Sequence, residues 1–276
     1  MKFISKFFKN NTPIINVIRM NGVIASGSKF PGSSNLSLES LEKQIERAFS
    51  GKKIAGVALI INSPGGSPVQ SALISERIVE LSSKNNIPVF AFVEDVAASG
   101  GYWLACSADE IFVMPASIVG SIGVISAGFG FVEVIKKIGV ERRVFSKGEN
   151  KGMLDPFQPQ NSDDVKVITD LQEEIHNQFK EWVSKRRGNR LDKEIINKEG
   201  IFEAKIFSGV KACEIGLADS IGELKQVMRE RFDEKVIFKE ISGRKKLGQR
   251  LGLSSSKYYK VIDYIEEKIA FARYGL

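Results

Sequence analysis

Two short, almost uninterrupted apolar runs constrain the fold of this 276-residue chain more than any other feature. Residues 56–62 and 88–93 each have the length of one strand, and neither alternates between polar and apolar positions. A strand that is apolar on both faces is typical of a parallel sheet covered by helices. Small residues and then a helical pattern follow each run. We therefore predict an α/β fold with largely parallel strand pairing.

Further elements are expected around these two runs. We predict additional strands at residues 13–18, 110–113 and 122–125, and helices at residues 37–49, 69–83, 102–107 and 163–187. Ser67 suits the N-cap of the second helix and Pro68 its first position. A last amphipathic helix, near residues 257–273, is expected to dock on the body of the protein or on a neighbour.

The counts of metal-ligating residues exclude several classes of site. The chain has one histidine, His176, and two cysteines, Cys106 and Cys213. Zinc clusters and disulfide frameworks need more ligands than this, so we expect no metal and no other cofactor. Cys106 falls on a predicted helix and is expected to be a core residue.

The distribution of charge divides the chain into regions. The net charge is +7, and residues 224–276 hold thirteen Lys and Arg against seven Asp and Glu. We predict a basic N-terminal segment at residues 1–13 and a basic C-terminal extension at residues 225–276. The extension is expected to be a solvated surface, with contact to acidic lipid as an alternative, and no nucleic-acid partner is expected.

No stretch of the sequence approaches the length needed to span a bilayer. Charges interrupt the apolar residues of the first ten positions, so these do not form the apolar core of a secretory signal. A spanning helix requires about 18–20 consecutive apolar residues. We expect a cytoplasmic protein, or one peripheral to the cytoplasmic membrane.

Two glycine-rich turns follow the two buried strands. The first is residues 62–68, Asn-Ser-Pro-Gly-Gly-Ser-Pro, and the second lies within residues 95–102, where Ser99 precedes two glycines. Such turns leave backbone N–H groups free at a helix N-terminus, a geometry that suits an oxyanion. Ser99 is either a helix cap or a nucleophile. Because neighbouring parallel strands end at one edge, the two turns are expected to meet in a crevice.

A nucleophilic serine needs a base. His176 lies on the flank of the apolar stripe of its predicted helix, which favours a half-buried helix residue over a base. Lysine is the other candidate, because burial lowers the pKa of an amine and leaves it able to accept the serine proton. Spacing alone does not choose between Lys147 and Lys151.

Five segments, in matching order, resemble the signal peptide peptidase A family. They cover the two turns, the Gly-Ser-Ile-Gly-Val segment, the Lys-Gly-Met-Leu-Asp-Pro segment and a later stretch rich in small residues, at residues 62–66, 96–102, 120–124, 151–156 and 201–222. The resemblance spans residues 14–224, which would form the peptidase domain. The length fits the short form of the family, with one catalytic module.

The resemblance implies both a fold and a mechanism. The fold would be of the Clp-protease and crotonase type, with repeated ββα units and here a C-terminal helical extension. Ser99 matches the nucleophile, Lys151 the general base and Ser121 a serine that orients the lysine amine. The N–H groups of Gly66 and Gly100 match the oxyanion donors. The reaction would be endopeptidase cleavage of peptide bonds through an acyl-enzyme, on cleaved signal peptides or unfolded polypeptides.

The resemblance also implies a ring of identical subunits in which serine and lysine of one site come from neighbouring protomers. Two departures from the family pattern are visible: Gly152 stands where many members have an acidic residue, and the membrane anchor of many members has no counterpart here. The alternatives are a crotonase-type acyl-CoA enzyme and a catalytically silent, membrane-associated scaffold. Neither would require Ser99, Ser121 and Lys151 together, which favours the peptidase.

Overall fold

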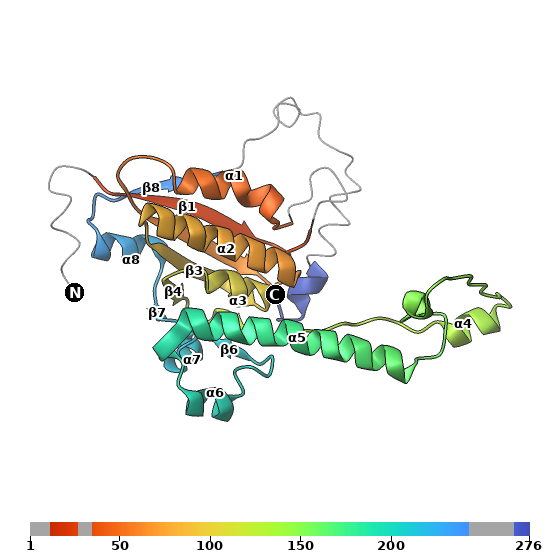
Figure 1. The fold of residues 1–276 in the computed structure, drawn as a ribbon. Coiled ribbons are helices and arrows are strands. Elements are labelled where there is room, and N and C mark those ends of the chain that lie inside the picture. Colours follow the sequence, from red (N-terminus) through yellow and green to blue (C-terminus); the bar gives the residue numbers. More distant parts are fainter. Residues whose placement is uncertain (1–11, 27–34, 243–267) are drawn as a thin grey trace. The chain divides into compact units, whose positions relative to one another are not determined.

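The computed structural model describes residues 12–26, 35–242 and 268–276 (Figure 1). The chain forms two compact units: unit 1 comprises Met1–Ile122 and Lys180–Leu276, and unit 2 comprises Gly123–Phe179. Among the described residues, none of the helices combines the length and the apolar character that crossing a bilayer requires.

A twisted sheet organises unit 1. Its main path runs β6-β5-β3-β2-β1-β8, and β4 pairs with β3 and with β7. Every pairing is parallel except that of β5 with β6. The strands are β1 (Ile14–Asn21), β2 (Ile54–Ser63), β3 (Val89–Ala98), β4 (Glu110–Val113), β5 (Ile118–Gly120), β6 (Ile206–Ser208), β7 (Ser220–Ile221) and β8 (Ile237–Glu240). The predicted α/β class with largely parallel pairing is confirmed.

Helices cover both faces of this sheet. The labelled helices that lie wholly in unit 1 are α1 (Leu38–Ala48), α2 (Pro68–Asn85), α3 (Gly100–Ala105), α6 (Lys193–Glu199), α7 (Gly209–Glu214) and α8 (Leu224–Arg231), with a short 3-10 turn at Gly188–Arg190. Figure 1 shows α1 and α2 side by side across one face. Successive residues of β1 explain the two faces: Ile15 and Val17 join the apolar cluster that contains α8, whereas Asn16 between them donates to the Ala48 carbonyl of α1 at 2.7 Å.

Most of the elements expected from the sequence are present, and one strand was misplaced. Ser67 caps α2 by accepting from the Gln70 N–H, with Pro68 at the first turn as predicted. The strand predicted at residues 122–125 is wrong, because the second strand after the second glycine-rich turn is β5, which ends at Gly120. Gly120 (φ 109°) and Ser121 (φ 54°) both have left-handed backbone, which ends the strand there.

The C-terminal region contains both described and undescribed parts. Residues 257–267 of the predicted last helix lie outside the described residues, and residues 268–272 are helical. Within the predicted extension, β8 pairs with β1 in the central sheet. The domain boundaries after residues 13 and 224 stay predictions.

Unit 2 is a loop-rich segment with few buried side chains. It contains α4 (Val132–Lys137), a 3-10 turn at Glu149–Gly152 and the first part of α5 (Ser162–Arg187), a helix that ends in unit 1. Arg142 Nε contacts the Asp155 carboxylate at 2.7 Å, and this guanidinium holds the pKa of Asp155 below its ordinary value. The Phe131 N–H donates to the Pro156 carbonyl at 2.6 Å, so the loop is tied to the start of α4.

A buried ion pair joins three parts of unit 1. The Arg187 side chain, only 1% exposed, forms a two-pronged contact with Asp219 at 2.9 and 3.2 Å, and its Nε donates to the Gly216 carbonyl. Asp219 also accepts from the Ile111 N–H of β4 at 2.7 Å. The end of α5, the segment between α7 and β7, and β4 are therefore fixed by one carboxylate.

We predict that Asp219→Asn lowers the free energy of unfolding by about 3 kcal/mol, because it leaves the buried guanidinium of Arg187 without its counter-charge. Urea unfolding measures the loss. Glu80→Gln is the matched control, since it breaks the exposed contact between Glu80 and Arg77 and is expected to cost much less. Equal losses for the two variants would contradict this role of the buried pair.

Candidate active site

The two glycine-rich turns meet at the carboxyl ends of β2 and β3. In the sheet register Ser63 of β2 pairs with Ala97 of β3, directly before the two turns. A side chain built on Gly65 would place its Cβ 2.8 Å from the Ser99 Cβ and 2.8 Å from the Gly100 nitrogen. The expected meeting of the two turns is present in the structure, and it requires the absence of a side chain at Gly65.

Ser99 occupies a strained position at the junction of β3 and α3. Its backbone has φ 52° and ψ −124°, a conformation that residues with a Cβ rarely adopt. The cost of such a conformation is about 1–3 kcal/mol, and it persists only where the surroundings hold it. The Ser99 N–H donates to the Gly120 carbonyl at 2.8 Å, while the Ser99 carbonyl accepts from the Tyr102 and Trp103 N–H groups.

The Ser99 hydroxyl does not cap the N-terminus of α3. Its side chain makes no capping hydrogen bond to α3, unlike that of Ser67 at the start of α2. The residue is half-buried and its neighbours at positions 98, 100 and 101 are small and buried. Of the two roles considered for Ser99, the geometry therefore favours the nucleophile over the cap.

Two backbone donors converge beside this serine. The Gly100 N–H is the first of α3 and has no acceptor within the helix. The Gly66 nitrogen lies 3.4 Å from the point where a Gly100 Cβ would stand, and its N–H donates no hydrogen bond to another described residue. Ile24 holds the turn from both sides, since its N–H donates to Gly65 at 2.8 Å and its carbonyl accepts from Ser67 at 2.7 Å.

Ser121 directly follows Gly120, whose carbonyl accepts the hydrogen bond from the Ser99 N–H. Pairing of β3 with β5 places Ala98 opposite Gly120, so Ser99 and Ser121 follow two neighbouring strand ends. The Ser121 N–H donates to the Lys205 carbonyl at 2.7 Å, which helps to keep its left-handed backbone in place. Four of the five predicted site residues are thus brought to one edge of the sheet in unit 1.

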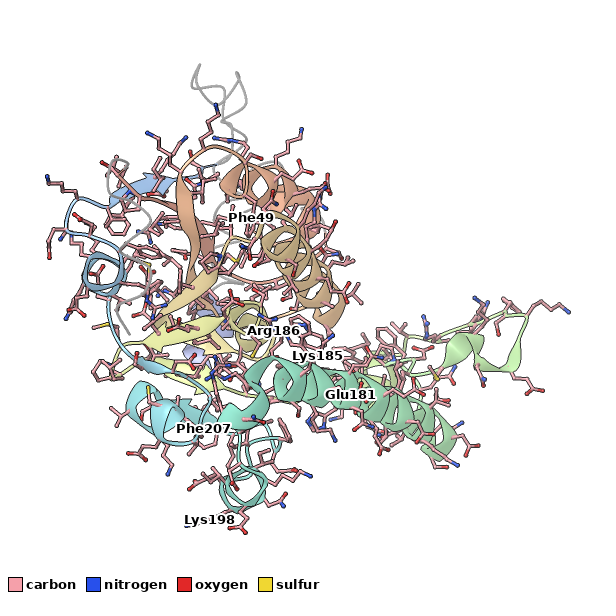
Figure 2. All side chains as sticks on the ribbon, turned by 60° about the vertical axis from the view of Figure 1, so that its left-hand side comes forward. Phe49, Glu181, Lys185, Arg186, Lys198 and Phe207 are labelled. Atoms are coloured by element: carbon pink, nitrogen blue, oxygen red, sulfur yellow. The ribbon has the colours of Figure 1, made fainter. Side chains whose placement is uncertain are left out.

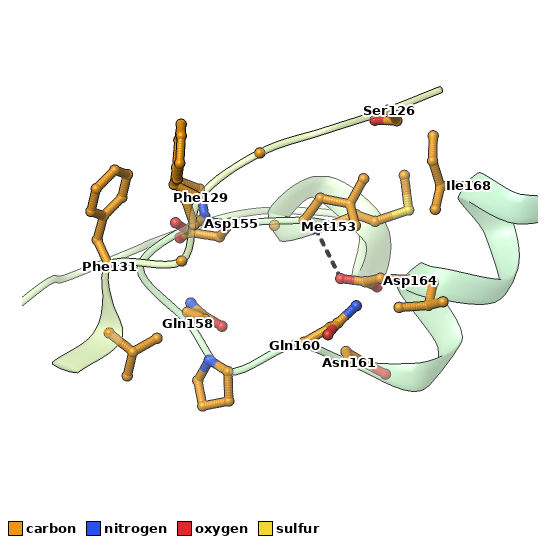
Figure 3. Close-up of a pocket in the computed structure, with 18 of the residues that line it drawn as sticks. Ser126, Phe129, Phe131, Met153, Asp155, Gln158, Gln160, Asn161, Asp164 and Ile168 are labelled. Carbon is orange, nitrogen blue, oxygen red and sulfur yellow. Dashed lines mark hydrogen bonds between the residues drawn. The ribbon is translucent and has the colours of Figure 1, made fainter. Parts of the chain in front are cut away.

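Lys151, the fifth predicted site residue, belongs to unit 2. It lies in the 3-10 turn at Glu149–Gly152, exposed, with its N–H donating to the Gly148 carbonyl at 3.2 Å. Unit 2 contains a pocket of about 1250 Å³ lined by Phe129, Met153 and other residues (Figure 3). Beside it, the Leu154 N–H donates to the Asp164 carboxylate at 2.9 Å. The turn that carries Lys151 is therefore held by hydrogen bonds within unit 2.

The other sequence candidates have simpler roles. Cys106 is fully buried, and burial raises the pKa of its thiol to about 12. A neutral, buried thiol is not a nucleophile. His176 is half-buried near the middle of α5, in unit 2.

Sequence reasoning gave no role to two groups that shape the site. The buried Ser63 hydroxyl accepts from the Gly65 N–H at 3.2 Å and so folds the first turn back on itself. Lys205 contributes its carbonyl, which supports Ser121, and only the position of Gly120 signals this contact: a Cβ there would lie 2.7 Å from the Lys205 oxygen. Nothing in the spacing of residues indicates that the start of β6 meets β5.

Comparison with known proteins identifies the family. Residues 82–237 match the model of Peptidase family S49, and the chain belongs to this family. The chain therefore carries a domain of a family of serine peptidases, as the five motifs predicted.

Two relatives and one solved protein illustrate the likeness. The chain is 41% identical to a Brucella abortus protein named Na(+)/H(+) antiporter NhaA, over 100% of this chain and 39% of that protein. It is 31% identical to protease 4 of Haemophilus influenzae, over 78% of this chain and 34% of that protein. The chain thus spans between a third and two fifths of the length of these relatives.

The solved protein is 1510-N, a membrane-bound stomatin-specific protease. A serine-to-alanine mutant of it aligns with a TM-score of 0.55 at 15% identity, covering 84% of this chain and 99% of that chain. A lysine-to-alanine mutant, solved with a substrate peptide, aligns with a TM-score of 0.51 at 16% identity, covering 92% of this chain and 98% of that one. The likeness confirms the predicted fold of the Clp-protease and crotonase type.

Gly66 in the first turn lies tightly against the backbone of Ile24. Gly66 has φ 141°, and a Cβ there would overlap the Ile24 carbonyl oxygen. We predict that Gly66→Ala lowers the free energy of unfolding by about 2–4 kcal/mol, because a fixed backbone atom must move. Gly152→Ala is the control, since a Cβ at Gly152 meets nothing within 4 Å. Urea unfolding measures the free energy of unfolding of both variants. A Gly66→Ala protein as stable as Gly152→Ala would show that the contact between Gly66 and Ile24 is not tight.

Proposed function

We propose that the protein is a serine endopeptidase in which Ser99 is the nucleophile, Lys151 the general base and Ser121 the residue that orients the lysine amine. One observation carries this proposal: Ser99 has a strained backbone, and its hydroxyl, which does not cap α3, lies beside the N–H groups of Gly66 and Gly100. Membership in Peptidase family S49 supports the same roles. No finding favours an acyl-CoA enzyme or a silent scaffold.

The proposed reaction has two balanced halves. The neutral amine of Lys151 accepts the proton of Ser99 Oγ as this oxygen attacks the peptide carbonyl carbon. The N–H groups of Gly66 and Gly100 stabilise the oxyanion that forms. The C–N bond then breaks, the lysine proton passes to the leaving amine, and an ester remains on Ser99. Water then attacks the ester carbonyl carbon while the same amine takes its proton. The bond from that carbon to Ser99 Oγ breaks, the proton passes to Oγ, and the acid product leaves.

The proposed substrates are polypeptides in extended form, either unfolded proteins or cleaved signal peptides. The turns around Ser99 consist of small residues, which leave room for a peptide backbone to approach the hydroxyl. The solved complex of 1510-N with a substrate peptide shows that this fold accommodates peptide in that relative. Peripheral contact of the basic C-terminal extension with acidic lipid remains a prediction from charge alone.

We propose further that the active sites form in a ring of identical subunits, with Ser99 and Lys151 of one site supplied by neighbouring protomers. Unit 2, which carries Lys151, exposes several large apolar side chains: Ile125 is 69% exposed, Phe129 82%, Ile138 67% and Phe145 94%. Exposed apolar surface of this kind is typical of protein–protein contacts. A head-to-tail contact closes into a ring when its rotation permits.

The proposed dyad is tested by single substitutions. Ser99→Ala and Lys151→Ala are each expected to lower peptide hydrolysis at least about 10³-fold, as removal of a catalytic nucleophile or base does in other hydrolases. Cleavage of an unfolded polypeptide is followed by mass spectrometry, with circular dichroism as the check on folding. His176→Ala is the control and is expected to retain most activity. A folded His176→Ala protein without activity would show that the lysine mechanism is wrong.

Sharing of the site between subunits is tested by mixing the two inactive variants. After dissociation and reassembly of equal amounts of Ser99→Ala and Lys151→Ala, about a quarter of the wild-type activity is expected for a heterologous contact, since that share of sites pairs Ser99 with Lys151. Native mass spectrometry establishes that subunits have exchanged. Exchange without any recovered activity would place both residues in the same chain.

A further inference from the structure

Helix α3, which begins directly after Ser99, is too short to fix its own position. It has six residues, Gly100–Ala105, all buried. A helix of this length is not stable in isolation, so its placement depends on contacts with its surroundings. Because Ser99 and the Gly100 N–H stand at its first turn, a shift of α3 moves both the proposed nucleophile and one oxyanion donor.

The end of α5 holds the other end of α3. The Trp182 indole N–H donates to the Trp103 carbonyl at 3.0 Å, and the Ser75 hydroxyl of α2 donates to the same oxygen at 3.3 Å. Arg186 Nε donates to the Cys106 carbonyl at 2.8 Å, and Arg186 Nη2 reaches the next two carbonyls, of Ser107 at 3.0 Å and Ala108 at 3.1 Å. Figure 2 shows Arg186 where the end of α5 passes α3.

The planar guanidinium of Arg186 binds the carbonyls at the C-terminal end of α3. Carbonyls at a helix end lack partners within the helix, and a cation there also meets the negative end of the helix dipole. The rings of Trp103 and Trp182 stack at 6.3 Å with an angle of 17°, and the guanidinium of Arg186 lies 5.9 Å from the Trp182 ring. One arginine and one tryptophan of α5 therefore bind four backbone carbonyls: that of Trp103 within α3, and those of the three residues that follow the helix, Cys106, Ser107 and Ala108.

We propose that Arg186 and Trp182 are positioning residues for the nucleophile: they hold the far end of α3 so that Ser99 and the Gly100 N–H remain aligned for attack. This inference rests on the proposed function of Ser99. Neither residue touches the proposed reacting atoms, so their loss affects the rate of attack by Ser99 more than the binding of substrate. A displacement of about 1 Å at reacting groups is enough to lower a rate up to about 100-fold.

The test uses the full chain and three readouts. The variants are Arg186→Gln, which removes the charged fork, and Trp182→Phe, which removes the indole N–H and keeps a smaller stacking ring. The readouts are the rate at which a fluorophosphonate acylates Ser99, kcat and KM for an unfolded polypeptide, and urea unfolding. We expect Arg186→Gln to lower the acylation rate and kcat about tenfold with KM within about twofold, and Trp182→Phe to lower both rates about threefold. Arg186→Lys, which keeps the charge without the planar fork, is expected to be intermediate.

Arg231→Gln is the matched control. Arg231 is 21% exposed, as is Arg186, and its two terminal nitrogens pair with Glu110 on the α8 side of the sheet, away from α3. This variant is expected to lose stability and to be acylated at the wild-type rate. Wild-type acylation rates in both Arg186→Gln and Trp182→Phe would overturn the positioning role, and so would equal slowing in Arg231→Gln. A wild-type protein not labelled at Ser99 would instead overturn the proposed function.

Discussion

The hydrogen bond from the Ser99 N–H to the Gly120 carbonyl, 2.8 Å long, is the interaction on which the candidate site depends. It joins the ends of β3 and β5 and holds Ser99 in a backbone conformation that the residue would not adopt alone. The conformation directs the chain from β3 straight into α3. Gly120 and Ser121 also have positive φ angles, so the ends of β3 and β5 constrain one another. Ser121 follows the end of β5 as Ser99 follows the end of β3.

Close backbone approach supplies the rest of the site. A Cβ at Gly65 would crowd the Ser99 turn. A Cβ at Gly66 would overlap the Ile24 carbonyl, and one at Gly101 would overlap the Ser63 carbonyl. The glycines thus allow two strand–helix turns to pack without side chains between them. What remains at their junction is a hydroxyl and two N–H groups without partners among the described residues. Such preorganised donors are the usual source of transition-state stabilisation in acyl transfer.

Much of this arrangement was predictable from the sequence, for identifiable reasons. Continuous apolar runs fixed β2 and β3 as buried parallel strands, and Ser67 with Pro68 marked the start of α2. The pairing of Gly65 and Gly66 with Ser99 follows from the rule that neighbouring parallel strands end together. Local patterns were weaker at β5, a three-residue strand whose end is set by backbone conformation at Gly120 and not by apolar periodicity.

Other parts of the site depend on contacts that no local pattern reveals. Lys205 meets Gly120, and Arg186 meets the carbonyls that follow α3, across some 80 residues of sequence in each case. The choice of Lys151 over Lys147 came from resemblance to a family, since both lysines have similar surroundings in the sequence. A hydrogen bond between a backbone carbonyl and a distant part of the chain leaves no pattern in the order of side chains. The groups that hold the site in place were therefore harder to predict than the site residues themselves.

The roles of Ser99, Gly66 and Gly100 are tested by a crystal structure of the protein after reaction with a fluorophosphonate that mimics the tetrahedral intermediate. We expect phosphorus bonded to Ser99 Oγ, with one phosphoryl oxygen within about 2.7–3.1 Å of the nitrogens of both Gly66 and Gly100. A modified residue other than Ser99, or a phosphoryl oxygen directed away from those two N–H groups, would contradict these roles.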